Sequence, residues 1–102
     1  MVKHMILWKL KEEISAGERA ERIAEAKARL ESLVGKVPGL LFLTVHTGAL
    51  PSSTADMMLD STFTDEETLA AYQKNPLHVE AATYVRSIVG QRLCLDFEGA
   101  AE

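Results

Sequence analysis

The chain has 102 residues, of which 47% are hydrophobic and 25% charged, so its composition is that of one folded globular domain. Its net charge is −4, and its basic residues are scattered along the chain. Both facts argue against a general affinity for nucleic acid or for an anionic lipid surface, because each of these calls for a basic face. We expect no nucleic-acid partner and no membrane partner.

The chain has a single cysteine, Cys94, so it cannot form an internal disulfide bond. Near its start, the apolar run from Met5 to Trp8 is too short for the core of a signal peptide and far too short to span a bilayer. A cytoplasmic location is therefore expected by default. We expect one domain over residues 1–98, followed by a flexible tail at 99–102.

The segment 2–11 is predicted to be a strand with two substantially apolar faces. One face carries His4, Ile6, Trp8 and Leu10, and the other carries Met5 and Leu7. A helix is then predicted to begin at a capping box formed by Ser15 and Glu18 and to end near Gly35.

Two further strands are predicted on either side of a turn at 48–54. The strand at 40–47 is expected to direct Leu41, Leu43 and Val45 to one face and Leu40 and Phe42 to the other. The strand at 56–63 is expected to direct Met57, Leu59 and Phe63 to one face and Met58, Asp60 and Thr62 to the other.

The last third of the chain predicts two short helices and a strand. An acidic cap beginning at Thr64 starts a helix that runs to about Lys74. Asn75 and Pro76, which suit an N-cap and a first turn, start a second helix that runs to about Tyr84. The strand at 91–98 then alternates Leu93, Leu95 and Phe97 with Arg92, Cys94 and Asp96.

This order of elements is typical of an α+β fold, the ferredoxin-like βαββαβ arrangement with a four-stranded antiparallel sheet. Right-handed crossovers place both helices on one face of the sheet. The opposite face then carries an uncovered apolar patch, which normally contacts a partner. We expect a homodimer in which two sheets meet through this helix-free face and form a dimeric α/β barrel. The residues expected in the patch are Met5, Leu7, Leu93, Leu95 and Phe97.

Tyr72 and His78 place a phenol and an imidazole on either side of a helix break. The first turn of a helix disfavours an imidazolium, so His78 is expected to stay neutral, as a general base near neutral pH requires. Tyr72 would donate a hydrogen bond to a developing oxyanion. Both residues can instead be structural, with His78 bonded to a backbone carbonyl and Tyr72 packed through its ring.

His4 lies among apolar neighbours on the first strand, where it is either a hydrogen-bonded core residue or a polar anchor in a small-ligand pocket. In the second case the catalytic candidates are His78, Tyr72 and His4. The substrate-binding candidates are Ile6, Trp8, Met57 and Leu59.

Neither a metal nor a cofactor is expected. The histidines have no close ligand spacing, Cys94 is expected to be a buried apolar residue, and the acids of the strands are expected to form a solvated rim. The sequence has no glycine-rich phosphate loop and no dinucleotide fingerprint.

Five short motifs follow one another along nearly the whole chain. They are Lys3-His4-Met5-Ile6-Leu7-Trp8-Lys9, Val37-Pro38-Gly39, Phe63 before the acidic cap, Ala71-Tyr72 with Asn75-Pro76-Leu77-His78, and Asp96-Phe97-Glu98. In this order and at these spacings, they resemble the stress-responsive A/B barrel domain (Dabb) family. The resemblance implies a dimeric α+β barrel and an association with the stress response.

A plant branch of that family includes polyketide cyclases, which close aromatic rings by aldol-type chemistry without a cofactor. The resemblance implies that Tyr72 and His78 match their catalytic pair and that His4 matches a histidine of the same pocket. The chain differs at Met57, where the cyclases place another histidine.

Three functions remain open. The first is a non-catalytic dimeric barrel that binds a small apolar or aromatic molecule or serves a stress role through its stability. The second is a cofactor-free acid–base enzyme of the polyketide cyclase type, with His78 as base, Tyr72 as hydrogen-bond donor and His4 orienting the substrate. The third is a cofactor-independent oxygenase of the same barrel shape.

Overall fold

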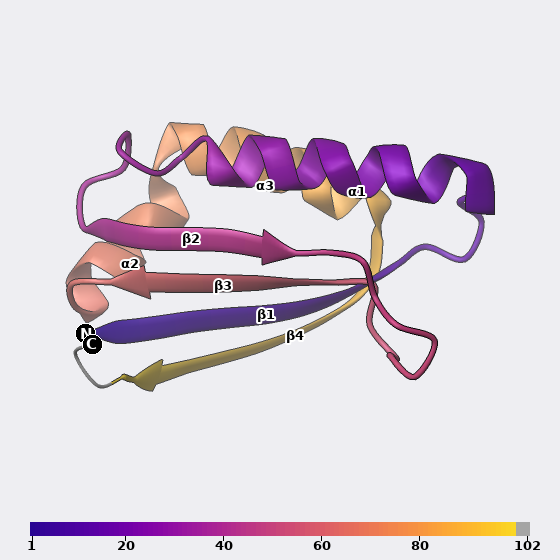
Figure 1. Ribbon diagram of the computed structural model, residues 1–102. Helices are drawn as coiled ribbons and strands as arrows, with labels where there is room; N and C mark the ends of the chain where they lie inside the picture. The colour runs from indigo at the N-terminus through magenta and orange to yellow at the C-terminus, as the bar shows by residue number, and fades with distance from the viewer. Residues whose placement is uncertain (100–102) are drawn as a thin grey trace.

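The computed structural model describes residues 1–99, which form a four-stranded sheet with its helices on one side (Figure 1). The elements in chain order are β1 (Val2–Leu10), α1 (Ala16–Glu31), β2 (Leu40–His46), β3 (Met57–Phe63), α2 (Glu66–Lys74), α3 (Pro76–Ile88) and β4 (Val89–Glu98). The strands lie in the order β2-β3-β1-β4, and every neighbouring pair is antiparallel. The predicted ferredoxin-like fold is confirmed.

The two faces of the sheet differ in burial, as the alternation of residues along β1, β3 and β4 predicts. Ile6 on β1 is buried and pairs with the buried Leu59 on β3. Leu7, the next residue of β1, is 42% exposed and pairs with Leu93 of β4, which is 72% exposed. The core therefore lies on the helix side of the sheet, and apolar side chains also collect on the side that has no helices.

Strand β2 departs from the predicted alternation at its start. A β-bulge shifts its register against β3 between Leu40 and Phe42, so that Leu41 is an extra residue. As a result, Leu40 is buried and Leu41 is exposed, which makes the prediction for these two residues wrong. After the bulge, Leu43 and Val45 point into the core as expected.

Strand β4 is an edge strand that its own subunit leaves uncovered. Helices α1 and α3 lie against each other on one side of the sheet (Figure 1), yet every residue of β4 from Gly90 to Glu98 is exposed. The prediction that Cys94 is buried is therefore wrong for the single chain. A long exposed edge strand with apolar side chains is a ready surface for pairing with another chain.

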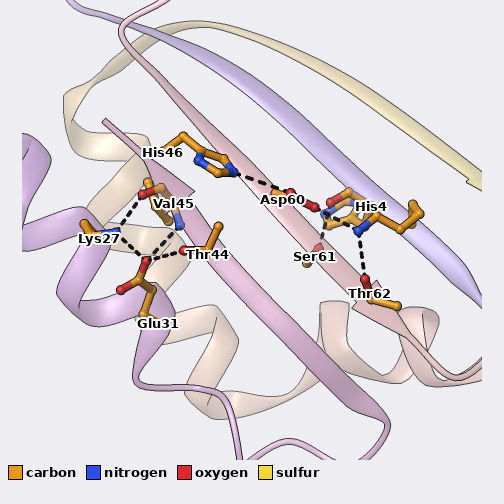
Figure 2. A network of polar contacts seen from close by, with 10 residues as sticks. His4, Lys27, Glu31, Thr44, Val45, His46, Asp60, Ser61 and Thr62 are labelled. Carbon is orange, nitrogen blue, oxygen red and sulfur yellow. Dashed lines mark hydrogen bonds and ion pairs between the residues drawn. The ribbon is translucent and has the colours of Figure 1, made fainter. Parts of the chain in front are cut away.

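A polar network attaches α1 to β2 (Figure 2). The Glu31 carboxylate accepts hydrogen bonds from Lys27 at 2.6 Å, from the backbone amide of Val45 at 2.9 Å and from the hydroxyl of Thr44 at 3.1 Å. Desolvation opposes the charged form, but these hydrogen bonds outweigh it and lower the pKa of Glu31. The helix is thus held over the sheet through an ionised carboxylate.

The ends of the described chain meet. The backbone amide of Gly99 donates to the carbonyl of Met1 at 2.8 Å, and residues 100–102 of the predicted flexible tail lie outside the described residues. Within residues 1–99, no helix combines the length and the apolar character that crossing a membrane demands.

Candidate functional site

A cavity of about 120 Å³ lies between the sheet and the helices α2 and α3. All but one of the predicted site residues line it, namely His4, Ile6, Trp8, Leu59, Tyr72 and His78. The exception is Met57, which is buried on the same strand face as Leu59 but lines a different hollow, next to the 46–56 segment. The structure therefore brings the three predicted catalytic side chains to one cavity.

The break between α2 and α3 sets Tyr72 and His78 against each other. The backbone amide of Asn75 donates to the carbonyl of Tyr72 at 3.1 Å, and the Asn75 side chain accepts from the amide of Leu77 at 2.9 Å. Asn75 thereby ends one helix and caps the next, as the sequence predicts. The two ring centroids are 4.0 Å apart, with an interplanar angle of 39°.

His78 is held as a neutral imidazole. Burial is the main cause that lowers its pKa, and the positive charges of Arg86 and Arg92 and the nearby His4 ring act in the same direction. The nearby backbone of Gln73 acts in the opposite direction and offsets part of this lowering of the pKa. The Nδ1 atom of His78 is buried and has no hydrogen-bond partner within residues 1–99. A ring nitrogen at the cavity is thus left free for a proton or for a ligand.

Tyr72 is 1% exposed and belongs to an aromatic cluster at the base of the cavity. Its ring centroid lies 4.8 Å from that of Phe63 and 6.3 Å from that of His4. Burial raises the pKa of the Tyr72 phenol above its ordinary value. The phenol therefore keeps its proton at neutral pH and can act as a hydrogen-bond donor.

His4 combines the two roles that the sequence leaves open for it. It is a buried, hydrogen-bonded core residue, because its Nδ1 atom bonds the Oδ1 atom of Asp96 on β4. It also lines the cavity. The buried hydroxyl of Ser61 donates to the His4 carbonyl at 2.7 Å and so fixes the backbone at this position (Figure 2).

His4, Cys94 and Asp96 form the one group of side chains in residues 1–99 that has the donor set of a metal site. Their ligand atoms all lie within 4.8 Å of one another, and such nitrogen, sulfur and oxygen donors suit zinc. Desolvation and the Asp96 carboxylate raise the pKa of the Cys94 thiol, whereas the adjacent Arg92 offsets part of that rise. Because the Arg92 guanidinium already supplies a cation here, the absence of a metal stays our prediction.

Three charged residues at the site were not predicted as site residues: Arg86 and Arg92, which line the cavity, and Asp96, which bonds His4. The alternation of β4 does put Arg92 and Asp96 on one strand face, so part of the signal is present in the sequence. Their approach to His4 depends on the pairing of β4 with β1, in which Asp96 is opposite His4 and Arg92 is opposite Trp8. Arg86 reaches the same cavity from the last turn of α3.

Comparison with known protein families decides where this chain is grouped. The family model described as "Stress responsive A/B Barrel Domain" (Dabb) matches residues 2–99. The chain belongs to the Dabb family. None of the curated proteins matches this Dabb protein significantly in sequence.

Solved structures of the same fold include dimers. A dimeric ferredoxin-like protein of unknown function from Bacteroides fragilis aligns with a TM-score of 0.90 at 26% identity, over 96% of this Dabb chain and 95% of its own. A second such dimer, from a Jannaschia species, aligns at 0.78 with 24% identity, over 96% and 98% of the two chains. A hydroxynitrile lyase from Passiflora edulis aligns at 0.72 with 17% identity, over 94% and 90%. The last two are similar to the Dabb chain in fold alone.

The buried imidazole makes folding stability depend on pH. A histidine in an unfolded chain titrates near pH ~6.5, whereas the pKa of His78 is lowered in the folded protein. The unfolded chain therefore binds this proton more readily, and acidification below that pH favours unfolding. We expect the free energy of unfolding, measured in urea at constant protein concentration, to fall less between neutral pH and the folded-state pKa in His78→Gln than in the parent. Parallel losses in the two proteins would contradict this expectation.

Proposed function

We propose that this Dabb protein is a homodimer that binds a small, largely apolar molecule in the cavity between its sheet and α2–α3. One observation carries the proposal, namely the buried and unpartnered Nδ1 atom of His78, a residue that lines the cavity. A buried polar atom without a partner costs about 1–3 kcal/mol, and a ligand that bonds it recovers that cost.

The sheet surface supports the homodimer. Leu93, Leu95 and Phe97 are between 43% and 72% exposed on the side without helices. Leu95 is paired with Met5 and Leu93 with Leu7, so the apolar side chains are contiguous across β1 and β4. A second copy that presents the same face would cover this surface in both subunits through one two-fold contact. The solved relatives of this fold include dimers, which agrees with the proposal.

Replacing Leu95 by Asp tests the helix-free face as the dimer contact. A twofold interface buries this leucine twice, at about 1.5–3 kcal/mol for each copy. We expect the parent to be a dimer and Leu95→Asp a monomer in light scattering at micromolar concentration. Val79→Asp is the matched control, because Val79 is 44% exposed in α3, on the side of the sheet that carries the helices (Figure 1). A monomeric parent, or a dimeric Leu95→Asp protein, would overturn the proposed contact.

The lining of the cavity supports ligand binding. Ile6, Trp8 and Leu59 contribute apolar walls. The polar groups of the lining come from His4, Tyr72, Gln73, His78, Arg86 and Arg92. Small-molecule sites generally combine an apolar wall with few oriented polar groups.

A thermal-shift screen of small aromatic and apolar compounds tests the cavity as the binding site. At a free concentration of about 100 times Kd, a ligand adds about 2.7 kcal/mol of stability. We expect at least one compound to raise the Tm of the parent by several degrees and to leave that of His78→Gln unchanged. His46→Gln is the control, because His46 is 54% exposed and outside this cavity. Equal shifts in all three proteins would place the compound elsewhere.

A second function, cofactor-free acid–base catalysis, is favoured by the contact between Tyr72 and His78. A neutral imidazole and a protonated phenol, with ring centroids 4.0 Å apart, are suited to remove a proton from a substrate and to hydrogen-bond the resulting oxyanion. Polyketide cyclases of the aldol type would use this pair, with His4 orienting the substrate. The Passiflora protein of this fold is a hydroxynitrile lyase, so the fold is compatible with lyase chemistry.

Proton exchange at a carbon next to a carbonyl tests the acid–base pair without knowledge of the substrate. With acetophenone in deuterium oxide, we expect the parent to accelerate loss of the methyl NMR signal. A positioned general base contributes about 10²–10⁴-fold, so His78→Gln should lose an acceleration of that order. Tyr72→Phe should lose part of it, and His46→Gln should keep it. Equal exchange in the parent and in His78→Gln would remove His78 from catalysis.

A further inference from the structure

Two arginines line the cavity and were not used in the function proposed above. Arg86 lies in the last turn of α3, Arg92 lies on β4, and both side chains line the same cavity as His78. Among the ion pairs formed within residues 1–99, none contains Arg86 or Arg92, whereas Arg19, Arg22 and Arg29 each pair with a carboxylate. Two solvent-exposed guanidinium groups without a carboxylate partner therefore border a partly apolar cavity in a chain whose net charge is −4.

The acidic residue of β4 that is closest in sequence to Arg92 already has hydrogen-bond partners. Asp96 bonds the buried Nδ1 atom of His4 and also accepts from the Cys94 thiol at 3.5 Å. Among the contacts formed by residues 1–99, Arg86 donates to the neutral hydroxyl of Thr83, at 3.4 Å, and to no carboxylate. Guanidinium groups form their strongest hydrogen bonds with carboxylates, frequently through two parallel N–H donors. The charge that these arginines lack is one that a ligand can bring.

The imidazole of His78 also favours a negatively charged ligand. Its Nδ1 atom is buried without a partner, and both arginines act on its ring as positive charges. A carboxylate bound between the arginines would satisfy a proton on the ring and would offset the positive field around it. The three groups thus share one complementary feature, a negative charge at the arginine side of the cavity.

The volume of the cavity limits the body of the ligand. At about 120 Å³ it is close to the ~150 Å³ of an apolar cavity that holds one benzene molecule. Ile6, Trp8 and Val85 are each no more than 5% exposed and form an apolar wall of the size that one ring requires.

We propose that the cavity binds a small monocyclic aromatic carboxylate, with its ring against Trp8 and its carboxylate between Arg86 and Arg92. This proposal rests on the function proposed above, since it names the class of ligand for the same site. It adds that the ligand is an anion and that the two arginines, rather than the apolar wall, select it over a neutral molecule of the same shape.

Benzoate and benzamide test the proposal, because they have nearly the same shape and differ in charge. We expect isothermal titration of the parent to give a Kd for benzoate at least about tenfold below that for benzamide, as charge-assisted pairing requires. In the double variant Arg86→Gln with Arg92→Gln the preference should vanish while benzamide binding persists, which also shows that the cavity is intact. Arg29→Gln is the charge-matched control, because Arg29 pairs with Glu25 on α1 and stacks over Tyr84 outside the cavity. It should keep the preference.

The outcomes separate the two proposals. Equal Kd values for benzoate and benzamide in the parent would overturn the anion selectivity and leave the apolar binding site in place. A benzoate preference that survives in the double variant would also overturn it, since the carboxylate would then bind elsewhere. If the parent binds neither compound, both the anionic ligand and the small-ligand function of this cavity fail. As a further readout, bound benzoate should raise the NMR-measured pKa of His78 in the parent, and an unchanged value would count against the carboxylate's position.

Discussion

The antiparallel pairing of β4 with β1 is the interaction on which both surfaces of this protein depend. The register sets Asp96 opposite His4 and Leu95 opposite Met5, so alternate residues of β4 contribute to opposite faces of the sheet. On the helix side the pairing supplies a partner for the buried imidazole, and on the other side it assembles a continuous apolar surface. A slip of one residue would exchange these faces, placing Leu95 beside the cavity and a carboxylate in the apolar patch.

The side chains around the cavity differ in whether the fold supplies them with hydrogen-bond partners. His4 is satisfied within the fold by Asp96, whereas His78, Arg86 and Arg92 are left with unused bonding capacity around one small space. For the buried His78 nitrogen this is uncommon, since buried polar groups nearly always find partners, whereas the two arginine side chains are exposed to solvent. The free nitrogen is understandable if the fold is only part of the functional species, with a ligand completing the cavity and a second subunit covering the helix-free face of the sheet.

Most of the fold could be predicted from the sequence, because β1, β3 and β4 alternate cleanly and Asn75-Pro76 marks the helix break. The bulge at Leu41 could not, since an extra residue leaves no mark in an apolar run. Of the site, Tyr72 and His78 were predictable because a short break holds them together. The contribution of Asp96 to His4 was not, because it needs the register of strands 92 residues apart. The exposure of Cys94 likewise follows from strand order, which local patterns do not encode.

The position of Cys94 makes the protein a natural candidate for site-selective labelling. It is the sole thiol of the chain, it is exposed, and its sulfur lies 3.8 Å from Nδ1 of His4 at the border of the cavity. Its raised pKa keeps the sulfur protonated at neutral pH, so alkylation would be slow and readily timed. A fluorophore or spin probe could therefore be attached beside the cavity without first removing other cysteines, and its signal would come from one defined place in each subunit.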